Sequence, residues 1–288
     1  MQIKTKLPWW LKIIVKIFFS RLPIAYSVWR KIGLFRHGSM DKMEYAYNVY
    51  IRHFNQLVNR KSPVILELGP GDSLSTALFS LAHDCSKTYM IDVGDYANRE
   101  LENYRLVKDY VSKIIVNDKL SELQITSINE MLNYCNAEYY TDGLESLKKI
   151  ADKSVDLVFS QAVLEHIPKN EFYETFIEIH RILKDDGICS HEIDLRDHLA
   201  NGLNNLRFSE KFWESKFMSS SGFYTNRLRK SEMIEYFKKS GFNVTIMNET
   251  RWKKVPIDRS KLYGPFKSYS DDDLIISTFS VLLSPLAL

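Results

Sequence analysis

A short apolar run that ends in a glycine-rich turn constrains the fold of this chain more than any other feature. Val64–Leu68 has the composition of a strand buried on both faces of a parallel sheet. The turn Gly69-Pro70-Gly71 breaks it, and residues 73–79 then have the pattern of a helix with Ser73 at or near its N-cap. Strand, glycine turn and helix in this order predict a doubly wound α/β unit with a nucleotide-type ligand at the turn.

The residues around the turn favour a cationic nucleoside over a dinucleotide. A dinucleotide fingerprint has a third glycine where this chain has Leu74, and the carboxylate of Glu67 would repel a pyrophosphate. The sulfonium and ammonium groups of S-adenosyl-L-methionine instead favour a nearby negative charge. A second predicted strand ends at Asp92, 23 positions after Gly69, where an acid can accept both ribose hydroxyls. The alternative is a plain buried strand with a tight turn, in which Asp92 only caps a helix or loop.

With these residues the chain resembles a class I S-adenosylmethionine-dependent methyltransferase, type 11-like, from about Val64 to the C-terminus. A second block, residues 154–167, is similar to the fourth strand of that fold and the turn Leu164-Glu165-His166 after it. A helix over residues 171–183, a glycine turn and a fifth strand from Ile188 continue the likeness. The order of these parts is typical of small-molecule methyltransferases of that family.

The resemblance implies six cofactor-binding residues: Glu67, Gly69, Gly71, Asp92, Asp142 and Gln161. The acid and the two glycines of the first turn would hold the methionine part of the cofactor, and Asp92 would hold the ribose. Asp142, after a third strand, would approach the adenine amino group, and Gln161 would face the reacting end of the cofactor. The last two also have simpler interpretations, since Asp142 begins a good turn dipeptide and Gln161 could cap the next helix.

The expected fold is α/β: a doubly wound, Rossmann-like, seven-stranded and mostly parallel sheet with an antiparallel last strand, preceded by a basic amphipathic N-terminal helical region. We divide the chain into that region, residues 1–60, and a methyltransferase domain, residues 61–288. Further elements are expected over residues 41–60 (helix), 97–136 (two helices), 231–241 (helix capped by Ser231), 242–246 (strand) and 274–283 (last strand).

The N-terminal region differs from the rest of the chain in charge. Residues 1–60 contain 11 Lys and Arg against 2 acids, whereas the remainder contains 28 against 34. Lys12 and Lys16 interrupt the apolar segment, which argues against a membrane span and a cleaved signal peptide. Residues 1–36 combine eight basic side chains with tryptophans and phenylalanines, which predicts a helix on an anionic membrane surface. A helix that covers the cofactor cleft or forms a dimer is the alternative.

The cysteines and the charge distribution indicate the cellular compartment and the kind of partner. Cys85, Cys135 and Cys189 are far apart and in no metal or disulfide spacing, so we predict buried thiols in a reducing compartment. Nucleic acid is not an expected partner, because a phosphate-binding surface does not need so much apolar mass beside its basic residues. The chain is therefore predicted to be cytoplasmic and peripheral on the inner face of the plasma membrane.

Methyl transfer to a sugar hydroxyl needs a base, because a hydroxyl is a poor nucleophile near neutral pH. The fifth strand is expected to end near Ile193, which places Asp194, Asp197 and His198 on a loop over the cleft. We predict His198 as the base and Asp194 as the group that orients the hydroxyl, and His166 could also face the acceptor. His191 is expected inside the strand as a core histidine. The spacing of His191, Asp194, Asp197 and His198 matches no closed metal motif, so no metal is expected.

The acceptor is suggested by a narrower resemblance. Residues 190–198 resemble methyltransferases encoded with bacterial surface-polysaccharide genes, which implies O-methylation of a sugar in a surface glycan or its lipid-linked precursor. Aromatic residues within 201–229 are expected to form a wall for the acceptor, and a second basic stretch, residues 251–267, could bind a lipid-linked phosphate. The alternatives are a methyltransferase of a small lipid or quinone-like acceptor, and a non-catalytic cofactor-binding partner subunit.

Overall fold

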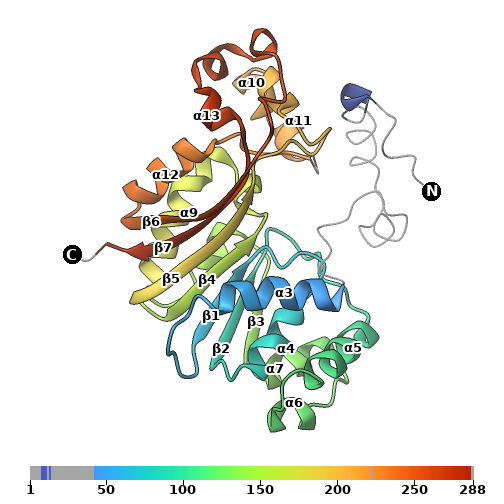
Figure 1. Cartoon of the computed structure of the whole chain (residues 1–288). Helices are drawn as coiled ribbons and strands as arrows, with labels where there is room; N and C mark the ends of the chain where they lie inside the picture. The colour runs from blue at the N-terminus through green and yellow to red at the C-terminus, as the bar shows by residue number, and fades with distance from the viewer. Residues whose placement is uncertain (1–7, 12, 14–41, 222, 287–288) are drawn as a thin grey trace.

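The computed structural model describes residues 8–11, 13, 42–221 and 223–286, whose seven strands form one mixed sheet (Figure 1). The strand order is β3-β2-β1-β4-β5-β7-β6. Strands β1 to β5 are parallel, and β7 runs antiparallel to both of its neighbours, β5 and β6. The predicted fold class is therefore confirmed. The bounds are β1 Val64–Leu68, β2 Lys87–Ile91, β3 Ala137–Tyr140, β4 Val155–Gln161, β5 Leu183–Asp194, β6 Phe242–Arg251 and β7 Ile276–Pro285.

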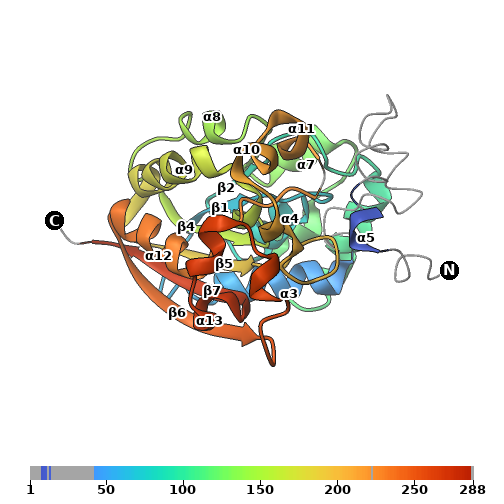
Figure 2. The same cartoon turned by 90° about the horizontal axis from the view of Figure 1, so that it is seen from above.

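Helices cover both faces of the sheet (Figures 1 and 2). Successive strand side chains point to opposite faces, so Ile65 packs in the core of one layer and Leu66 in the core of the other. The first layer consists of α3 Met43–Phe54, α4 Ser75–Ala82, α5 Leu101–Ser112, α6 Asp118–Glu122 and α7 Ile128–Tyr134. The second consists of α8 Leu144–Leu147, α9 Lys169–Ile182 and α12 Lys230–Lys239. In α9, Phe172, Phe176 and Ile179 recur at helical spacing and are fully buried, which fixes its inner face.

Short elements beyond one end of the sheet form a cap, residues 195–228 and 252–275 (Figure 1). Trp213 is the centre of one of its apolar clusters, and Leu262 and Phe266 belong to another. Buried Arg229 joins the cap to the sheet, because its guanidinium donates to carbonyl oxygens of both. The bounds are η2 Asn204–Arg207, α10 Glu210–Trp213, α11 Lys216–Ser219, η3 Arg259–Lys261, η4 Gly264–Ser268 and α13 Asp271–Leu274.

The described part of the N-terminal segment contacts the cap. The Trp9 ring lies edge-on to Phe208 at 6.1 Å between centroids, and the Arg207 guanidinium lies 5.1 Å from the Trp9 ring centre. Ile13 is buried in the cluster around Trp213. The rest of the predicted N-terminal helical and membrane-binding region lies outside the described residues. Among those that are described, no helix combines the length and apolar character needed to cross a bilayer.

Of the two serines predicted at helix starts, Ser73 lies near the N-cap as predicted and Ser231 does not. α4 begins at Ser75 with Leu74 as its N-cap residue, and the Ser73 hydroxyl accepts the backbone N–H of Ser75. Ser231 lies inside α12 and donates its hydroxyl hydrogen to Asp273, whereas Arg229 is the N-cap residue.

Other predicted bounds are corrected as well. Residues 97–136 contain three helices and not two, and Val116, in the break between α5 and α6, is 95% exposed. Leu274 belongs to α13, whose first turn is capped by the Ser270 hydroxyl, so the last strand begins at Ile276. The three cysteines are free thiols, but Cys85 is only half-buried.

Candidate functional site

The carboxyl ends of β1, β2 and β4 meet at one edge of the sheet, and the glycine turn lies there. Gly69 and Gly71 have φ angles of +67° and +62°, a conformation that side chains rarely adopt. The Gly69 N–H donates to the Ile91 carbonyl at 2.7 Å, and the Gly71 N–H donates to Asp92 Oδ2 at 3.0 Å. Asp92 also accepts the Val93 N–H at 2.7 Å. The carboxylate of Asp92 is therefore in direct contact with the glycine turn.

The turn after β4 packs against the glycine turn. A Cβ added to Gly69 would lie 2.5 Å from Cγ2 of Val163, which is too close for any side chain. Gln161 ends β4 two residues earlier, and its buried Oε1 has no hydrogen-bond partner among the described residues. The glycine turn and the turn that contains His166 are therefore neighbours.

Glu67 has a buried carboxyl group near the carboxyl end of β1. It is 2% exposed, and its Oε2 has no hydrogen-bond partner among the residues that the structure describes. Burial raises the pKa of this carboxyl to about 8, against a hydrogen bond from Thr76 that lowers it, and the charge of Asp92 raises it further. An acceptor oxygen in this state is suited to a cationic ligand, so Glu67 and the two glycines fit S-adenosyl-L-methionine.

Asp142 lies in the turn after β3, next to the turn that holds Asp92. The Gly143 N–H donates to the Asp92 carbonyl at 2.9 Å, which joins the turns after β2 and β3. The Asp142 carboxylate pairs with Lys149 Nζ at 2.9 Å, and its side chain is 63% exposed. Asp142 thus lies at the edge formed by the carboxyl ends of the parallel strands, and its carboxylate is paired with Lys149.

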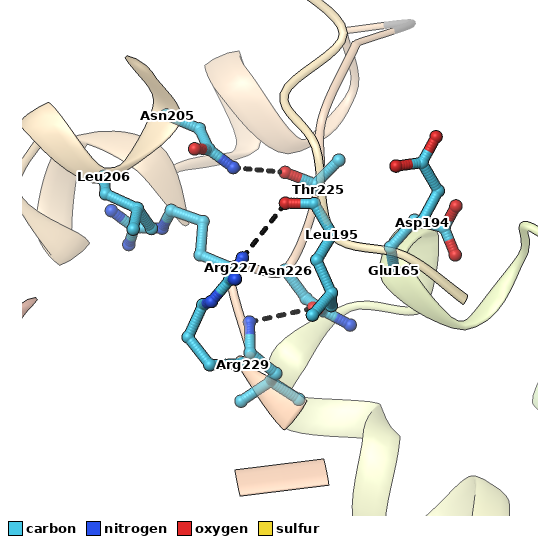
Figure 3. Close-up of a pocket in the computed structure, with 10 residues that line it drawn as sticks. Glu165, Asp194, Leu195, Asn205, Leu206, Thr225, Asn226, Arg227 and Arg229 are labelled. Carbon is cyan, nitrogen blue, oxygen red and sulfur yellow. Dashed lines mark hydrogen bonds between the residues drawn. The ribbon is translucent and has the colours of Figure 1, made fainter. Parts of the chain in front are cut away.

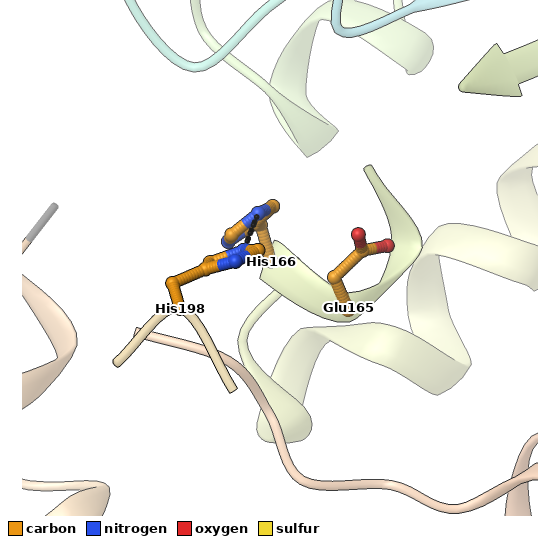
Figure 4. A group of neighbouring side chains, drawn as sticks. All are labelled: Glu165, His166 and His198. Atoms are coloured by element: carbon orange, nitrogen blue, oxygen red, sulfur yellow. Dashed lines mark hydrogen bonds between the residues drawn. The ribbon is translucent and has the colours of Figure 1, made fainter. Parts of the chain in front are cut away.

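His166 and His198 are in contact (Figure 4). His166 ends the 3-10 turn η1, Leu164–His166, and its Nδ1 lies 2.8 Å from the Tyr224 carbonyl oxygen. Since a carbonyl can only accept, the Nδ1 atom has the hydrogen, and the Nε2 atom of neutral His166 presents a lone pair. His198 Nε2 lies 3.0 Å from that atom, and the rings are 4.8 Å apart between centroids.

The loop that holds His198 is fixed by buried Asp197. This carboxylate accepts the backbone N–H groups of Leu199, Ala200 and Asn204. Its neighbour Asp194 is bound by Arg196, whose Nε and Nη2 lie 2.8 and 2.7 Å from the two carboxylate oxygens. Asp194 would therefore have to share its oxygens with Arg196 in order to orient a hydroxyl.

Glu165 has a buried carboxyl group that the sequence-based site did not include. It is 2% exposed, and neither carboxyl oxygen has a hydrogen-bond partner among the described residues. Burial raises its pKa well above the usual range. Figure 3 shows Glu165 beside Asp194 at one end of a small pocket, with Arg227 and Arg229 at the other. The signal in the sequence was its place next to His166.

The four residues whose spacing was weighed for a metal do not form a site. His191 is fully buried, and its Nδ1 lies 2.8 Å from the Ser160 hydroxyl, so it is the core histidine that the sequence predicts. Burial lowers its pKa to about 3. Within the described chain, a different group has suitable atoms: one ligand atom from each of Glu165, His166 and His198, all within 4.8 Å of one another. The spacing argument missed it because Glu165 and His198 belong to different loops.

A second buried histidine, absent from the sequence-based site, lies below this edge. His53 of α3 has Nδ1 2.8 Å from the Ser190 hydroxyl, and its ring stacks on Phe159 at 5.2 Å between centroids. Burial lowers its pKa to about 4, with a further contribution from Arg52. His53 is therefore neutral and supports β4 and β5 from the helix layer.

Comparisons with known proteins give one family match and several structural likenesses. Residues 66–190 match a family model described as a methyltransferase domain. A comparison with curated protein sequences gives no match. Among solved structures, the YcgJ protein from Bacillus subtilis is 14% identical over 84% of this chain and 100% of its own, with a TM-score of 0.46.

Two further structures give similar values. The DhpI–SAH complex is 12% identical over 96% of this chain and 98% of its own, with a TM-score of 0.45. An S-adenosylmethionine-dependent methyltransferase from Mesorhizobium loti is 15% identical over 84% of this chain and 99% of its own, with a TM-score of 0.45. Likenesses of this size say nothing about the acceptor.

Proposed function

We propose that the chain, which is an S-adenosyl-L-methionine-dependent methyltransferase, methylates a hydroxyl of a sugar in a bacterial surface glycan or in its lipid-linked precursor. The observation that supports a hydroxyl acceptor is the contact between His166 and His198. His166 belongs to the turn after β4, which packs against the glycine turn. A hydroxyl must lose its proton during methyl transfer, and imidazoles are the side chains best suited to that task near neutral pH. The sugar itself is inferred from residues 190–198 and their resemblance.

The cofactor would be held by the residues at the ends of β1, β2 and β4. Glu67 would face its cationic part, the turn Gly69–Gly71 would pass close to it, and Asp92 would accept its ribose hydroxyls. We propose Asp142 for the adenine amino group and Gln161 for the reacting end. When bound, S-adenosyl-L-methionine supplies a methyl group on a positively charged sulfur.

The acceptor would approach from the side of the two histidines. With the cofactor bound, the hydroxyl oxygen would accept the methyl group, and the electron pair of the broken carbon–sulfur bond would stay on sulfur. The hydroxyl proton leaves at the His166–His198 pair, for which His198 was predicted as the base. Tyr224 orients His166 through its carbonyl, and Asp194 with Arg196 would border the sugar.

A membrane surface is the proposed partner of the basic segments. Lys253, Lys254, Lys261 and Lys267 are exposed on the cap, which Trp9 and Ile13 also contact. Basic side chains near an anionic leaflet contribute about 1 kcal/mol each, so the cap and residues 1–36 would together bring the site to a lipid-linked acceptor. We propose that residues 1–60 form the basic N-terminal region and that residues 61–288 form the methyltransferase domain.

Isotope transfer tests the acceptor. The full chain is incubated with S-adenosyl-L-methionine that has a labelled methyl group and with free sugars, polyprenyl-phosphate-linked glycans or quinone-like phenols. We expect label in a sugar methyl ether. Label only in the phenol would establish the alternative acceptor class, and no label from a protein that binds the cofactor would indicate a non-catalytic subunit.

Calorimetry tests the cofactor residues. Asp92→Ala should reduce the affinity for S-adenosyl-L-methionine at least about tenfold, because the ribose hydroxyls and the Gly71 amide both lose their acceptor. Asp95→Ala is the matched control, since Asp95 is an exposed acid paired with Arg99. Equal affinities of the two variants would contradict the assignment.

Vesicle sedimentation tests the membrane partner. We expect the full chain to bind anionic vesicles and to be released as the salt concentration rises. Binding to neutral vesicles of equal strength, or no binding at all, would contradict the electrostatic part of the proposal.

A further inference from the structure

Glu165, His166 and His198 combine two imidazoles and a carboxylate at one place (Figure 4). The three residues offer ligand atoms within 4.8 Å of one another. Glu165 is buried while His166 is exposed and His198 half-exposed, so the group is closed on the carboxylate side and open on the imidazole side. The open side is where an acceptor could enter.

We propose that Glu165, His166 and His198 bind a divalent first-row transition metal ion that holds the acceptor hydroxyl. Two imidazoles and one carboxylate are a ligand set that such ions use when other coordination positions stay open for water or substrate. Mixed nitrogen and oxygen donors favour ions such as Zn²⁺, Mn²⁺ or Co²⁺ over Mg²⁺ or Ca²⁺, which prefer oxygen alone.

The distance between the two imidazole nitrogens fits this ligand set. At metal–nitrogen bonds of about 2.1 Å, two adjacent ligands at right angles lie about 3 Å apart. The Nε2 atoms of His166 and His198 are 3.0 Å apart. In the structure one hydrogen is shared across this distance, and a metal ion would replace it. The carboxylate of Glu165 would then move toward the ion to complete the set.

The surroundings orient the ligands as metal sites require. The Tyr224 carbonyl accepts the Nδ1 hydrogen of His166, which leaves Nε2 as the donor atom and fixes the ring. Asp197 fixes the backbone around His198 by accepting three main-chain N–H groups. The Glu165 oxygens have no other hydrogen-bond partner among the described residues, although the side chain is 2% exposed. A bound cation would satisfy this buried carboxyl group.

The inference rests on the proposed function, because it says how the histidine pair activates the hydroxyl. A hydroxyl bound to the ion releases its proton to solvent more readily, since the ion stabilises the negative oxygen. That oxygen then forms the bond to the methyl carbon, and the electron pair of the broken carbon–sulfur bond stays on sulfur. His198 acts in this case as a ligand and not as the base that the sequence predicts.

Metal binding can be measured without knowing the acceptor. The full chain, without any histidine tag and after dialysis against a chelator, is titrated with Co²⁺ by absorption spectroscopy and with Zn²⁺ by calorimetry. We expect one ion per chain, with visible Co²⁺ bands, and no competition from a large excess of Mg²⁺. His166→Gln, His198→Gln and Glu165→Gln should each weaken binding by at least about 100-fold.

Matched controls separate ligand loss from general damage. His180→Gln changes a histidine of α9 that packs on Phe242, and Glu192→Gln changes a half-buried acid near the end of β5, so both should bind the ion as the wild type does. All five variants should bind S-adenosyl-L-methionine normally, which verifies that they are folded.

The outcomes distinguish the two proposals. A wild-type chain that binds S-adenosyl-L-methionine but no transition metal would overturn the metal site and leave the histidines as base and partner. Metal binding that is unaffected by the three ligand variants would also overturn it. Failure to bind S-adenosyl-L-methionine would instead overturn the cofactor site on which the proposed function depends.

Discussion

The carboxyl group of Glu67 should lower the stability of the ligand-free protein, and Glu67→Gln should reveal by how much. Its pKa is about 8 in the folded chain against an ordinary value of 4.5, chiefly because the group is buried. A carboxyl whose pKa is raised by folding is protonated in the folded state over a pH range where the unfolded chain has already ionised. Its contribution to stability is therefore lost as the pH rises from about 4.5 to about 8.

The size of this effect follows from the two pKa values. Each unit of pKa difference corresponds to about 1.4 kcal/mol. Because Glu67 ionises more readily in the unfolded chain, it lowers the free energy of unfolding by about 3 kcal/mol at pH 7 and by about 5 kcal/mol above pH 8. Glutamine has nearly the same shape and no charge to bury. The variant should therefore gain these amounts relative to wild type, apart from a constant term for the altered hydrogen bond with Thr76.

Urea denaturation of both proteins without cofactor, at pH 5, 7 and 8.5, measures the difference directly. Other titrating groups are common to the two proteins and cancel, so only the pH dependence of the difference is interpreted. We expect it to grow by about 3–4 kcal/mol between pH 5 and 8.5. A difference that is constant over this range would refute the argument that Glu67 is a buried, reluctantly ionised group.

Three further predictions concern the same edge of the sheet and its support. The affinity for S-adenosyl-L-methionine should rise from pH 6 to 8.5, with release of up to one proton, because the cation favours ionised Glu67. Calorimetry in two buffers measures the affinity and the proton release, and Glu67→Gln should abolish both the pH dependence and the release. Gly69→Ala should cost about 1–3 kcal/mol in urea denaturation and weaken cofactor binding, since φ is +67° and Val163 blocks a Cβ, whereas Gly264→Ala has open space and should be neutral. Arg229→Met should lose about 3–5 kcal/mol, because buried carbonyls lose their donor, whereas exposed Arg99→Met should lose under about 0.5 kcal/mol by the same assay.

The sheet could be predicted because its strands have strong local signals. Val64–Leu68 is exact to the residue, since a continuous apolar run between turn residues has only one way to fit a parallel sheet. The position of Asp92 at the same edge as the glycine turn followed from the two strand ends, because parallel neighbours finish at the same edge. Signals of this kind need no knowledge of distant contacts.

The contacts among loops could not be predicted in the same way. His166 and His198 are 32 residues apart, and their approach depends on the Tyr224 carbonyl and the Asp197 turn, neither of which has a periodic pattern. The cap of α12 was missed for a related reason, since Ser231 binds Asp273, a partner that only the folded chain brings near. Helix boundaries that depend on which partner a polar side chain binds are decided by tertiary structure.

Two buried acids with unpartnered carboxyl oxygens link the cofactor side of the site to the acceptor side. Among the described residues, the acids with such unpartnered oxygens are Glu67 at the end of β1 and Glu165 in the turn after β4. An unsatisfied buried polar group costs about 1–3 kcal/mol or more, so a chain selected only for stability would replace both. β1 and β4 are adjacent strands, and Val163 of the second turn packs on Gly69 of the first. The two carboxyl groups therefore flank one small region, in which cationic partners, a sulfonium ligand at Glu67 and a metal ion at Glu165, would each offset the cost of burial.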